Sequence, residues 1–175
     1  MYNEKGWLVD DETSSEVELR ELLSGLLRML KPELAVETGC FLGRATLAMA
    51  RAVQENHLQG SGDFHPRLVS CDVDPEMVKA TARLLGANAC TFRVELRQCR
   101  GEDLPELPEA DFVFCDSDYR CRAREIELAK PGAVILVHDT RISYDSEVAP
   151  LEGLVRQLGG ICFDSHRGWG LIRKA

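Results

Sequence analysis

The chain has 175 residues, 45% of them hydrophobic and 29% charged, which predicts a single globular domain over residues 1–175 with a loose start at residues 1–12. Its 29 Asp and Glu residues outnumber its 21 Lys and Arg residues, and the net charge of −8 disfavours a broad nucleic-acid-binding surface. No apolar run is long enough to span a bilayer, and the polar residues 1–5 are not a signal peptide. We therefore expect a cytoplasmic protein without membrane contact, whose seven cysteines are reduced thiols.

Apolar runs and helical periodicities alternate along the chain. The runs predict strands at 34–36, 67–73, 91–98, 111–116, 133–139, 161–163 and 169–172. The periodicities predict helices at 13–30, from 43 onward, and at 74–85, 121–130 and 147–158, with a surface loop at 56–66 and a capping box formed by Thr13 and Glu16. This order predicts an α/β fold, Rossmann-like and doubly wound, with a mostly parallel seven-stranded sheet, an antiparallel C-terminal strand and helices on both faces.

The turn after the first predicted strand contains the sequence Glu37-Thr-Gly-Cys-Phe-Leu-Gly43. Gly39 and Gly43 let the backbone approach a ligand closely at the edge of the sheet. Their spacing is not the G-x-G-x-x-G pattern that binds a pyrophosphate, because Cys40 to Leu42 occupy that space. Glu37 would also repel a phosphate, and it suits a cationic ligand instead.

Four acidic residues, Glu37, Asp72, Asp116 and Asp139, fall at the ends of predicted strands. Each alone has the simpler interpretation of a loop acid or a helix cap. Because the carboxyl ends of parallel strands share one edge, the four together predict an acidic cleft. An acid that ends the second strand binds ribose hydroxyls in folds of this kind, so Asp72 indicates an adenosine-containing ligand. S-adenosylmethionine combines adenosine with an ammonium and a sulfonium, and it has no phosphate.

With these motifs, the chain resembles the class I S-adenosylmethionine-dependent methyltransferases, and among them the small-molecule O-methyltransferases. The resemblance covers residues from Gly6 to the C-terminus. It is based on five motifs in order, at residues 37–43, 69–74, 100–104, 111–118 and 131–140. It implies O-methylation of a small hydroxylated molecule. The cofactor-binding residues that it implies are Glu37, Thr38, Gly39, Cys40, Gly43, Asp72, Val73, Arg100, Gly101 and Asp116.

The same resemblance places Asp116 beside the reacting methyl group. His138 is a candidate general base, although a structural histidine at the sheet edge is an equal alternative. Tyr119 is a candidate for the acceptor pocket, or it packs over the rim of the cleft, and Tyr144 has the same two interpretations.

A metal site is a conditional expectation. In the catechol-type members of the resembled family, two acids and an amide hold a divalent cation, and here Asp116, Asp139 and Thr140 match those positions. Mg²⁺ accepts oxygen ligands of this kind. Thr140 replaces the amide, and Tyr119 stands where the family has a catalytic lysine. The alternative is that Arg120 or Arg141 neutralises the acids.

Two other functions remain open from the sequence: a nicotinamide-dependent oxidoreductase, and a non-catalytic cofactor-binding module. The expected partner is a small-molecule acceptor. A homodimer in which a partner copy supplies a lid is a further possibility.

Overall fold

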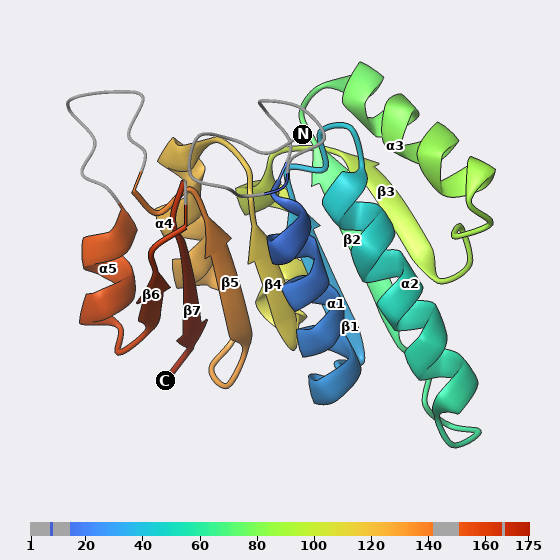
Figure 1. Cartoon of the computed structure of the whole chain (residues 1–175), viewed down its shortest axis with the longest axis horizontal. Helices are drawn as coiled ribbons and strands as arrows, with labels where there is room; N and C mark the ends of the chain where they lie inside the picture. The colour runs from blue at the N-terminus through green and yellow to red at the C-terminus, as the bar shows by residue number, and fades with distance from the viewer. Residues whose placement is uncertain (1–7, 9–14, 142–150, 166) are drawn as a thin grey trace.

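The computed structural model of the chain describes Leu8 and residues 15–141, 151–165 and 167–175. In this part of the chain, seven strands form one sheet in the order β3-β2-β1-β4-β5-β7-β6 (Figure 1). The strands from β3 to β5 are all parallel, and β7 runs antiparallel to both of its neighbours. This arrangement confirms the predicted Rossmann-like sheet with its antiparallel C-terminal strand.

The elements alternate along the chain as the sequence predicts. The strands are β1 Leu34–Thr38, β2 Arg67–Asp72, β3 Val94–Gln98, β4 Phe112–Cys115, β5 Val134–His138, β6 Ile161–Phe163 and β7 Trp169–Arg173. The helices are α1 Val17–Leu30, α2 Arg44–Gln59, α3 Pro75–Ala87, α4 Tyr119–Leu128 and α5 Leu151–Gln157, with short 3₁₀ turns η1 Gly101–Asp103 and η2 Leu107–Glu109.

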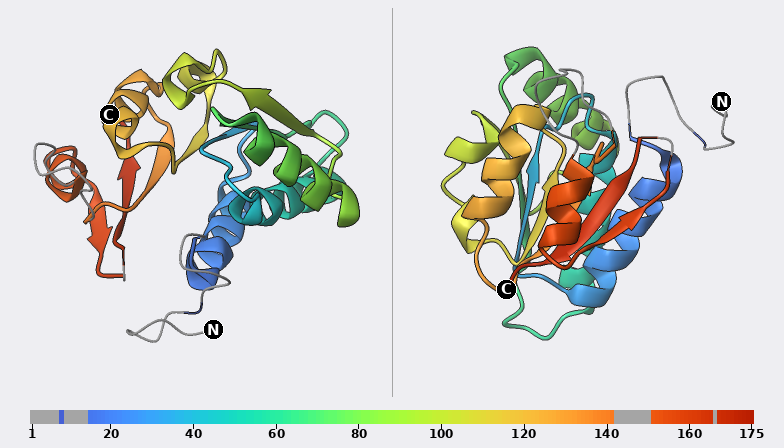
Figure 2. Two further views of the ribbon diagram at one scale, coloured as in Figure 1. Left: turned by 90° about the horizontal axis from the view of Figure 1, so that it is seen from above. Right: turned by 90° about the vertical axis from the view of Figure 1, so that its left-hand side faces the viewer.

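Helices cover both faces of the sheet (Figure 2). Alternate residues of a strand point to opposite faces, so each central strand contributes to two cores. On one face, Ala35 of β1 and Phe112 of β4 pack with α1 and α2. On the other face, Val36 of β1 packs in a core that includes Ile126 of α4 and Val155 of α5. Both cores are closed, so the polar side chains between them must find partners inside the protein.

Several predicted boundaries were wrong. Helix α1 begins at Val17, so Glu16 is its N-cap residue and cannot complete a capping box; Thr13 lies outside the described residues. Helix α2 continues through residues 56–59, which we predicted as loop, because the buried Asn56 amide donates to the carbonyl of Leu27. Helix α4 begins two residues early, at Tyr119, because the Asp118 side chain caps it by accepting from the Arg120 amide.

Other expectations have mixed outcomes. All seven cysteines are free thiols, as predicted. None of the helices in the described ranges is long and apolar enough to cross a membrane. Of residues 1–12, only Leu8 is described, and its amide donates to the Glu18 carboxylate. Tyr144, residues 147–150 of the predicted helix, and residue 166 between the last two strands lie outside the described residues.

Candidate active site

A cavity of about 640 Å³ opens at the carboxyl ends of the parallel strands, where the sequence placed the cleft. The loops after β1 to β5 form most of its wall, and the rest comes from α4 and the loop before β7. The lining residues are Gly39, Phe41, Asp72, Val73, Cys99, Arg100, Gly101, Asp116, Ser117, Asp118, Cys121, Arg122, Asp139 and Arg167. Six of the ten predicted cofactor-binding residues are therefore in this wall: Gly39, Asp72, Val73, Arg100, Gly101 and Asp116.

The turn between β1 and α2 is held close to β4. Gly39 has a φ of +86°, and a Cβ atom there would lie 2.8 Å from the Cα atom of Ser117, so only glycine fits without strain. The amides of Gly39 and Cys40 both donate to the carbonyl of Cys71, at 2.9 Å each. The Gly43 amide donates to the Cys40 carbonyl at 2.7 Å. The turn is thus tight, and several of its amides are already used.

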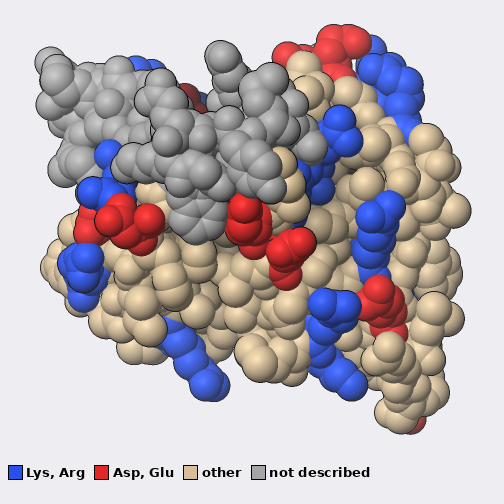
Figure 3. Space-filling model, in the orientation of Figure 1, with Lys and Arg blue, Asp and Glu red and all other residues tan. Residues whose placement is uncertain are grey.

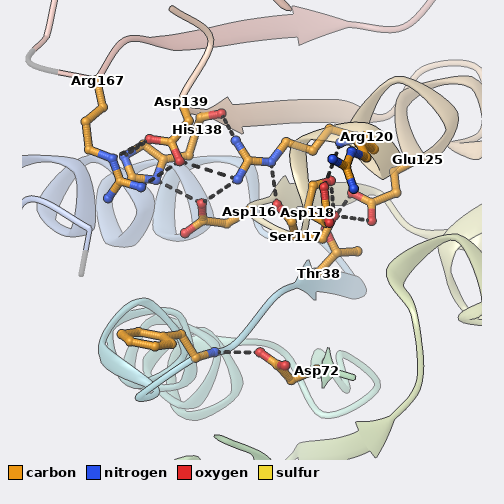
Figure 4. Close-up of polar contacts among 12 residues, drawn as sticks. Thr38, Asp72, Asp116, Ser117, Asp118, Arg120, Glu125, His138, Asp139 and Arg167 are labelled. Carbon is orange, nitrogen blue, oxygen red and sulfur yellow. Dashed lines mark hydrogen bonds and ion pairs between the residues drawn. The ribbon is translucent and has the colours of Figure 1, made fainter. Parts of the chain in front are cut away.

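Asp72 ends β2 at the mouth of the cavity (Figure 4). Its Oδ2 accepts from the amide of Phe41 at 2.9 Å, and its Oδ1 accepts from the amide of Asp74 at 3.0 Å. These two bonds orient the carboxylate while it remains partly accessible. Beside it, the Val73 side chain is 61% exposed and Phe41 is 38% exposed, so an apolar surface adjoins the acid.

Asp116 follows β4 and lies within a buried charged cluster. Its Oδ1 is 2.9 Å from Nδ1 of His138, and Nε2 of His138 is 2.9 Å from Oε2 of Glu16 (Figure 4 shows the first pair). Burial alone would lower the pKa of His138, but the carboxylates of Asp116, Glu16 and Asp139 raise it to about 10. Burial would raise the pKa of Glu16, and the bond to His138 outweighs it, so that pKa is lowered. His138 is therefore a buried imidazolium with both ring nitrogens engaged.

Two arginines complete this cluster. The buried Arg122 of α4 places Nη2 at 3.4 Å from Asp116 and at 3.4 Å from Asp139. Arg167, before β7, places Nε at 2.6 Å from Oδ1 and Nη2 at 2.7 Å from Oδ2 of Asp139. Arginines do pair with the predicted acids, as our alternative stated, and the described pairs involve Arg122 and Arg167. Arg141 pairs with Glu152 and Asp164.

Glu37 lies beneath the cleft and not in its wall. Strand β1 extends two residues beyond our prediction, to Thr38, so Glu37 remains within the strand and points toward α2. Its Oε2 accepts from Thr46 and Ser70 at 2.5 Å each, while its Oε1 has no hydrogen-bond partner among the described residues. Burial raises the pKa of Glu37 to about 7, partly offset by these two hydroxyl groups.

Thr38 points to the opposite face, where it contacts a second buried acid. Its hydroxyl donates to Oε2 of Glu125 at 2.7 Å, and the Ser117 hydroxyl donates to Oε1 at 2.6 Å (Figure 4). Burial raises the pKa of Glu125, and the two hydroxyl groups oppose that rise. The side chain of Glu125 therefore connects the end of β1 with the loop that follows β4.

The remaining predicted residues lie near the cavity but outside its wall. Cys40 lines a smaller adjoining depression of about 30 Å³ together with Gly39, and burial raises the pKa of its thiol to about 12. Gly43 is the N-cap of α2. Tyr119 begins α4, and the Arg120 guanidinium lies 5.4 Å from its ring centre.

The residues at the predicted metal position do not fit a divalent cation well. Asp116, His138 and Asp139 each offer a ligand atom within 4.8 Å of the others. Both Asp139 oxygens, however, are paired with Arg167, and Oδ1 of Asp116 is paired with His138. Thr140 is fully buried, and its hydroxyl has no partner in the described part of the chain.

Sequence reasoning missed Arg122, Arg167, Glu16 and Glu125. One signal was available for two of them: Arg122 and Glu125 lie four and seven residues after the helix-capping Asp118, a spacing that places them on the same helix face. Glu16 and His138 are 122 residues apart in the chain, and no local pattern indicates their contact.

Comparison with known proteins agrees with the geometry of the cleft and the sheet. Residues 36–140, from β1 to just beyond β5, match a protein-family model described as a methyltransferase domain. The chain belongs to this family. A curated mouse relative, catechol O-methyltransferase domain-containing protein 1, is 31% identical over 142 residues, covering 75% of this chain. The chain spans half the length of that relative.

Solved structures show the same fold. The O-methyltransferase TomG from Streptomyces achromogenes, in complex with SAM, has a TM-score of 0.70 at 21% identity, covering 95% of this chain and 84% of its own. An O-methyltransferase from Bacillus cereus, in complex with SAH, has a TM-score of 0.71 at 17% identity, covering 92% of this chain and 82% of its own. These findings confirm the resemblance inferred from the sequence, to a class I, O-methyltransferase-like fold.

Proposed function

We propose that this chain is an S-adenosylmethionine-dependent methyltransferase that methylates a hydroxyl group of a small molecule. The observation that carries the proposal is the position of Asp72 at the end of β2, beside the exposed Val73 and opposite the glycine turn. An oriented carboxylate next to an apolar surface suits a ribose with its attached adenine. The family match and the names of the mouse and bacterial relatives support O-methylation.

The cavity fits the cofactor in size and in chemistry. A volume of about 640 Å³ lies within the range of small-molecule sites. Asp72 would hold the ribose hydroxyls, Val73 and Phe41 would contact the adenine, and Arg100 and Gly101 would border it. Gly39 brings bare backbone to the remaining part of the cavity. When bound, the cofactor supplies an electrophilic methyl group on a sulfonium.

This chain's own contribution to methyl transfer is positioning and proton acceptance. Holding two reacting groups in line is worth about 7–11 kcal/mol at best. Asp116 lines the cavity, and its side chain is 18% exposed, so it can accept a hydrogen bond from an acceptor hydroxyl. His138 fixes Oδ1 of Asp116 from below. We therefore assign His138 as a positioning residue and Asp116 as the candidate base.

The turn geometry argues against a nicotinamide-dependent oxidoreductase. A pyrophosphate is bound by free amides at a glycine turn and helix start. Here the amides of Gly39, Cys40 and Gly43 donate to backbone carbonyls, and the Phe41 amide donates to Asp72. Little of the turn is left to bind phosphate oxygens.

The surface is consistent with a small-molecule substrate. On the face in Figure 3, acidic and basic side chains are interspersed among the described residues, so this face has the mixed charge of an ordinary solvated surface. Nucleic-acid recognition depends instead on clustered basic residues.

Isothermal titration calorimetry with S-adenosylhomocysteine and with NAD tests the proposed function. We expect S-adenosylhomocysteine to bind to the cavity with measurable heat, and NAD to give no saturable signal. Binding of NAD without binding of S-adenosylhomocysteine would refute the proposed cofactor. Binding of neither compound would favour a domain that has lost cofactor binding.

A substitution at Asp72 locates the ribose site. Hydrogen bonds to a charged group contribute about 1.5–3 kcal/mol each, so Asp72→Ala should weaken S-adenosylhomocysteine binding by about 10–150-fold. Asp72→Asn, which keeps one acceptor oxygen, should lose less. Asp63→Ala is the control, because Asp63 is exposed in the loop before β2, at the end of the parallel strands opposite to the cavity. Unchanged affinity in a folded Asp72→Ala protein would show that the ribose lies elsewhere.

A further inference from the structure

The guanidinium of Arg122 lies between the two acids that would hold a metal in the resembled family. Its Nη2 is 3.4 Å from Oδ1 of Asp116 and 3.4 Å from Oδ2 of Asp139. Its other nitrogens are fixed by the backbone, since Nε donates to the Ser117 carbonyl at 2.8 Å and Nη1 donates to the His138 carbonyl at 2.6 Å. The side chain is only 5% exposed, so this geometry is imposed by the fold.

Arg167 binds Asp139 from the other side. Its Nη2 donates to Oδ2 at 2.7 Å, and its Nε lies 2.6 Å from Oδ1, an ion-pair contact in which Oδ1 accepts no hydrogen bond from the described residues. With Arg122 also present, Oδ2 of Asp139 has two guanidinium neighbours and Oδ1 has one. Figure 4 shows Asp139 between Arg167 and the rest of the cluster.

We propose that the guanidinium groups of Arg122 and Arg167 replace a divalent cation at the Asp116–Asp139 pair, so that this methyltransferase domain works without a bound metal. Two fixed positive charges already balance the two carboxylates. An arginine does not lose its proton in a protein, so it cannot become neutral to admit a second cation. A metal at this position would therefore have to displace a buried guanidinium.

The ligand chemistry supports the same conclusion. Mg²⁺ requires near-octahedral oxygen coordination at about 2.0–2.1 Å, and it needs free carboxylate oxygens to reach it. Here Oδ2 of Asp139 accepts from Arg122 and Arg167, and Oδ1 of Asp116 is contacted by Arg122 and His138. Oδ1 of Asp139 lies 2.6 Å from Nε of Arg167, so the guanidinium stands where a cation would approach it. The third ligand in the resembled pattern, Thr140, is buried and is not among the described residues that line the cavity.

This inference rests on the proposed function in one respect, namely that methyl transfer takes place in this cleft. It changes how the acceptor hydroxyl is expected to lose its proton. Without a Lewis acid to lower the pKa of an acceptor hydroxyl, proton removal depends on Asp116. A metal can chelate two neighbouring oxygens of an acceptor. Asp116 can instead accept a hydrogen bond from one hydroxyl, so the site suits an acceptor that presents a single hydroxyl.

Binding of Mn²⁺, followed by electron paramagnetic resonance on the full chain with and without S-adenosylhomocysteine, tests the proposal without an activity assay. We expect no saturable binding to the wild type up to about 1 mM Mn²⁺. Removing the guanidinium charges should uncover the acids, so Arg122→Gln/Arg167→Gln should bind Mn²⁺ at least about tenfold more tightly than the wild type. Adding Asp139→Asn to that protein should abolish the gain.

Two further variants make the result interpretable. Arg124→Gln removes an exposed charge from the same helix, where Arg124 pairs with Glu127, and should leave Mn²⁺ binding unchanged. Arg167→Gln alone, at a partly exposed position, serves if the double variant does not fold. Saturable wild-type binding that disappears in Asp139→Asn would overturn the proposal, as would a folded Arg167→Gln or double variant that gains no affinity. Failure of the proposed function would be seen separately, as absent S-adenosylhomocysteine binding.

Discussion

Replacing Asp139 by alanine is expected to lower the free energy of unfolding by about 3–5 kcal/mol, because it removes the shared counter-ion of two arginines inside the protein. Asp139 is almost fully buried, and it pairs with both Arg122 and Arg167. Its loss would leave Arg122, among its described contacts, with Asp116 at 3.4 Å and two backbone carbonyls. Urea unfolding of the wild type and the variant, followed by circular dichroism, measures the difference.

A second variant separates charge from backbone strain. Asp139 has a φ of +55°, a left-handed conformation that Asp and Asn tolerate better than Ala. The destabilisation shared by Asp139→Asn and Asp139→Ala is therefore due to the lost charge. Asp164→Ala is the control: the Asp164 side chain is 82% exposed and pairs with Arg141 at the surface, so its loss should cost about 0–1 kcal/mol. A loss in Asp139→Ala no larger than that of the control would contradict the central role of Asp139.

The parts of this fold that depend on local pattern were predictable. Parallel strands must end at one edge, so the positions of Asp72, Asp116 and Asp139 followed from finding three apolar runs that each end in an acid. For Gly39 we predicted close approach of the backbone to a ligand, whereas the structure shows that a Cβ atom there would meet the backbone of Asp116 and Ser117 after β4. Six of the ten cofactor residues implied by the resemblance line the cavity, and Asp72 and Asp116 among them are strand-end acids.

The charged cluster below the cleft was not predictable, because it is assembled from distant segments. Glu16 comes from the start of α1, Arg122 from α4 and Arg167 from the loop before β7. Each is a common charged residue in an ordinary local pattern. Only the packing of the sheet brings them to His138, and the choice between a metal and an arginine depends on that packing.

The position of Glu37 shows a different kind of error. We took Glu37 as the first residue after the strand, but β1 includes it and Thr38. Extending a strand by two residues keeps alternate side chains on opposite faces, so these two polar residues point under the neighbouring helices and are not in the wall of the cavity. Their hydrogen bonds to Ser70, Thr46 and Glu125 compensate for the burial.

The buried state of Glu37 has a measurable consequence for stability as a function of pH. Its pKa is about 7 in the folded protein, compared with 4.5 for an exposed Glu. Between these values the folded state holds a proton that the unfolded state has released, so stability falls as pH rises through this window. Above pH 7 both states are ionised, and the full penalty of about 3 kcal/mol applies.

Glu37→Gln should remove this dependence, because a neutral amide can still accept from the hydroxyls of Thr46 and Ser70. Relative to the wild type, we expect the variant to gain about 2–3 kcal/mol in the free energy of unfolding between about pH 5 and about pH 8. His138 and Glu16 also make stability depend on pH, with signs opposite to each other. Both residues are present in both proteins, so their contributions cancel when the variant is compared with the wild type. Glu55→Gln, at an exposed position of α2, should show no such trend. A wild type and Glu37→Gln that lose stability in parallel would mean that Glu37 is already ionised in the folded protein, and that the charge finds a partner beyond Thr46 and Ser70.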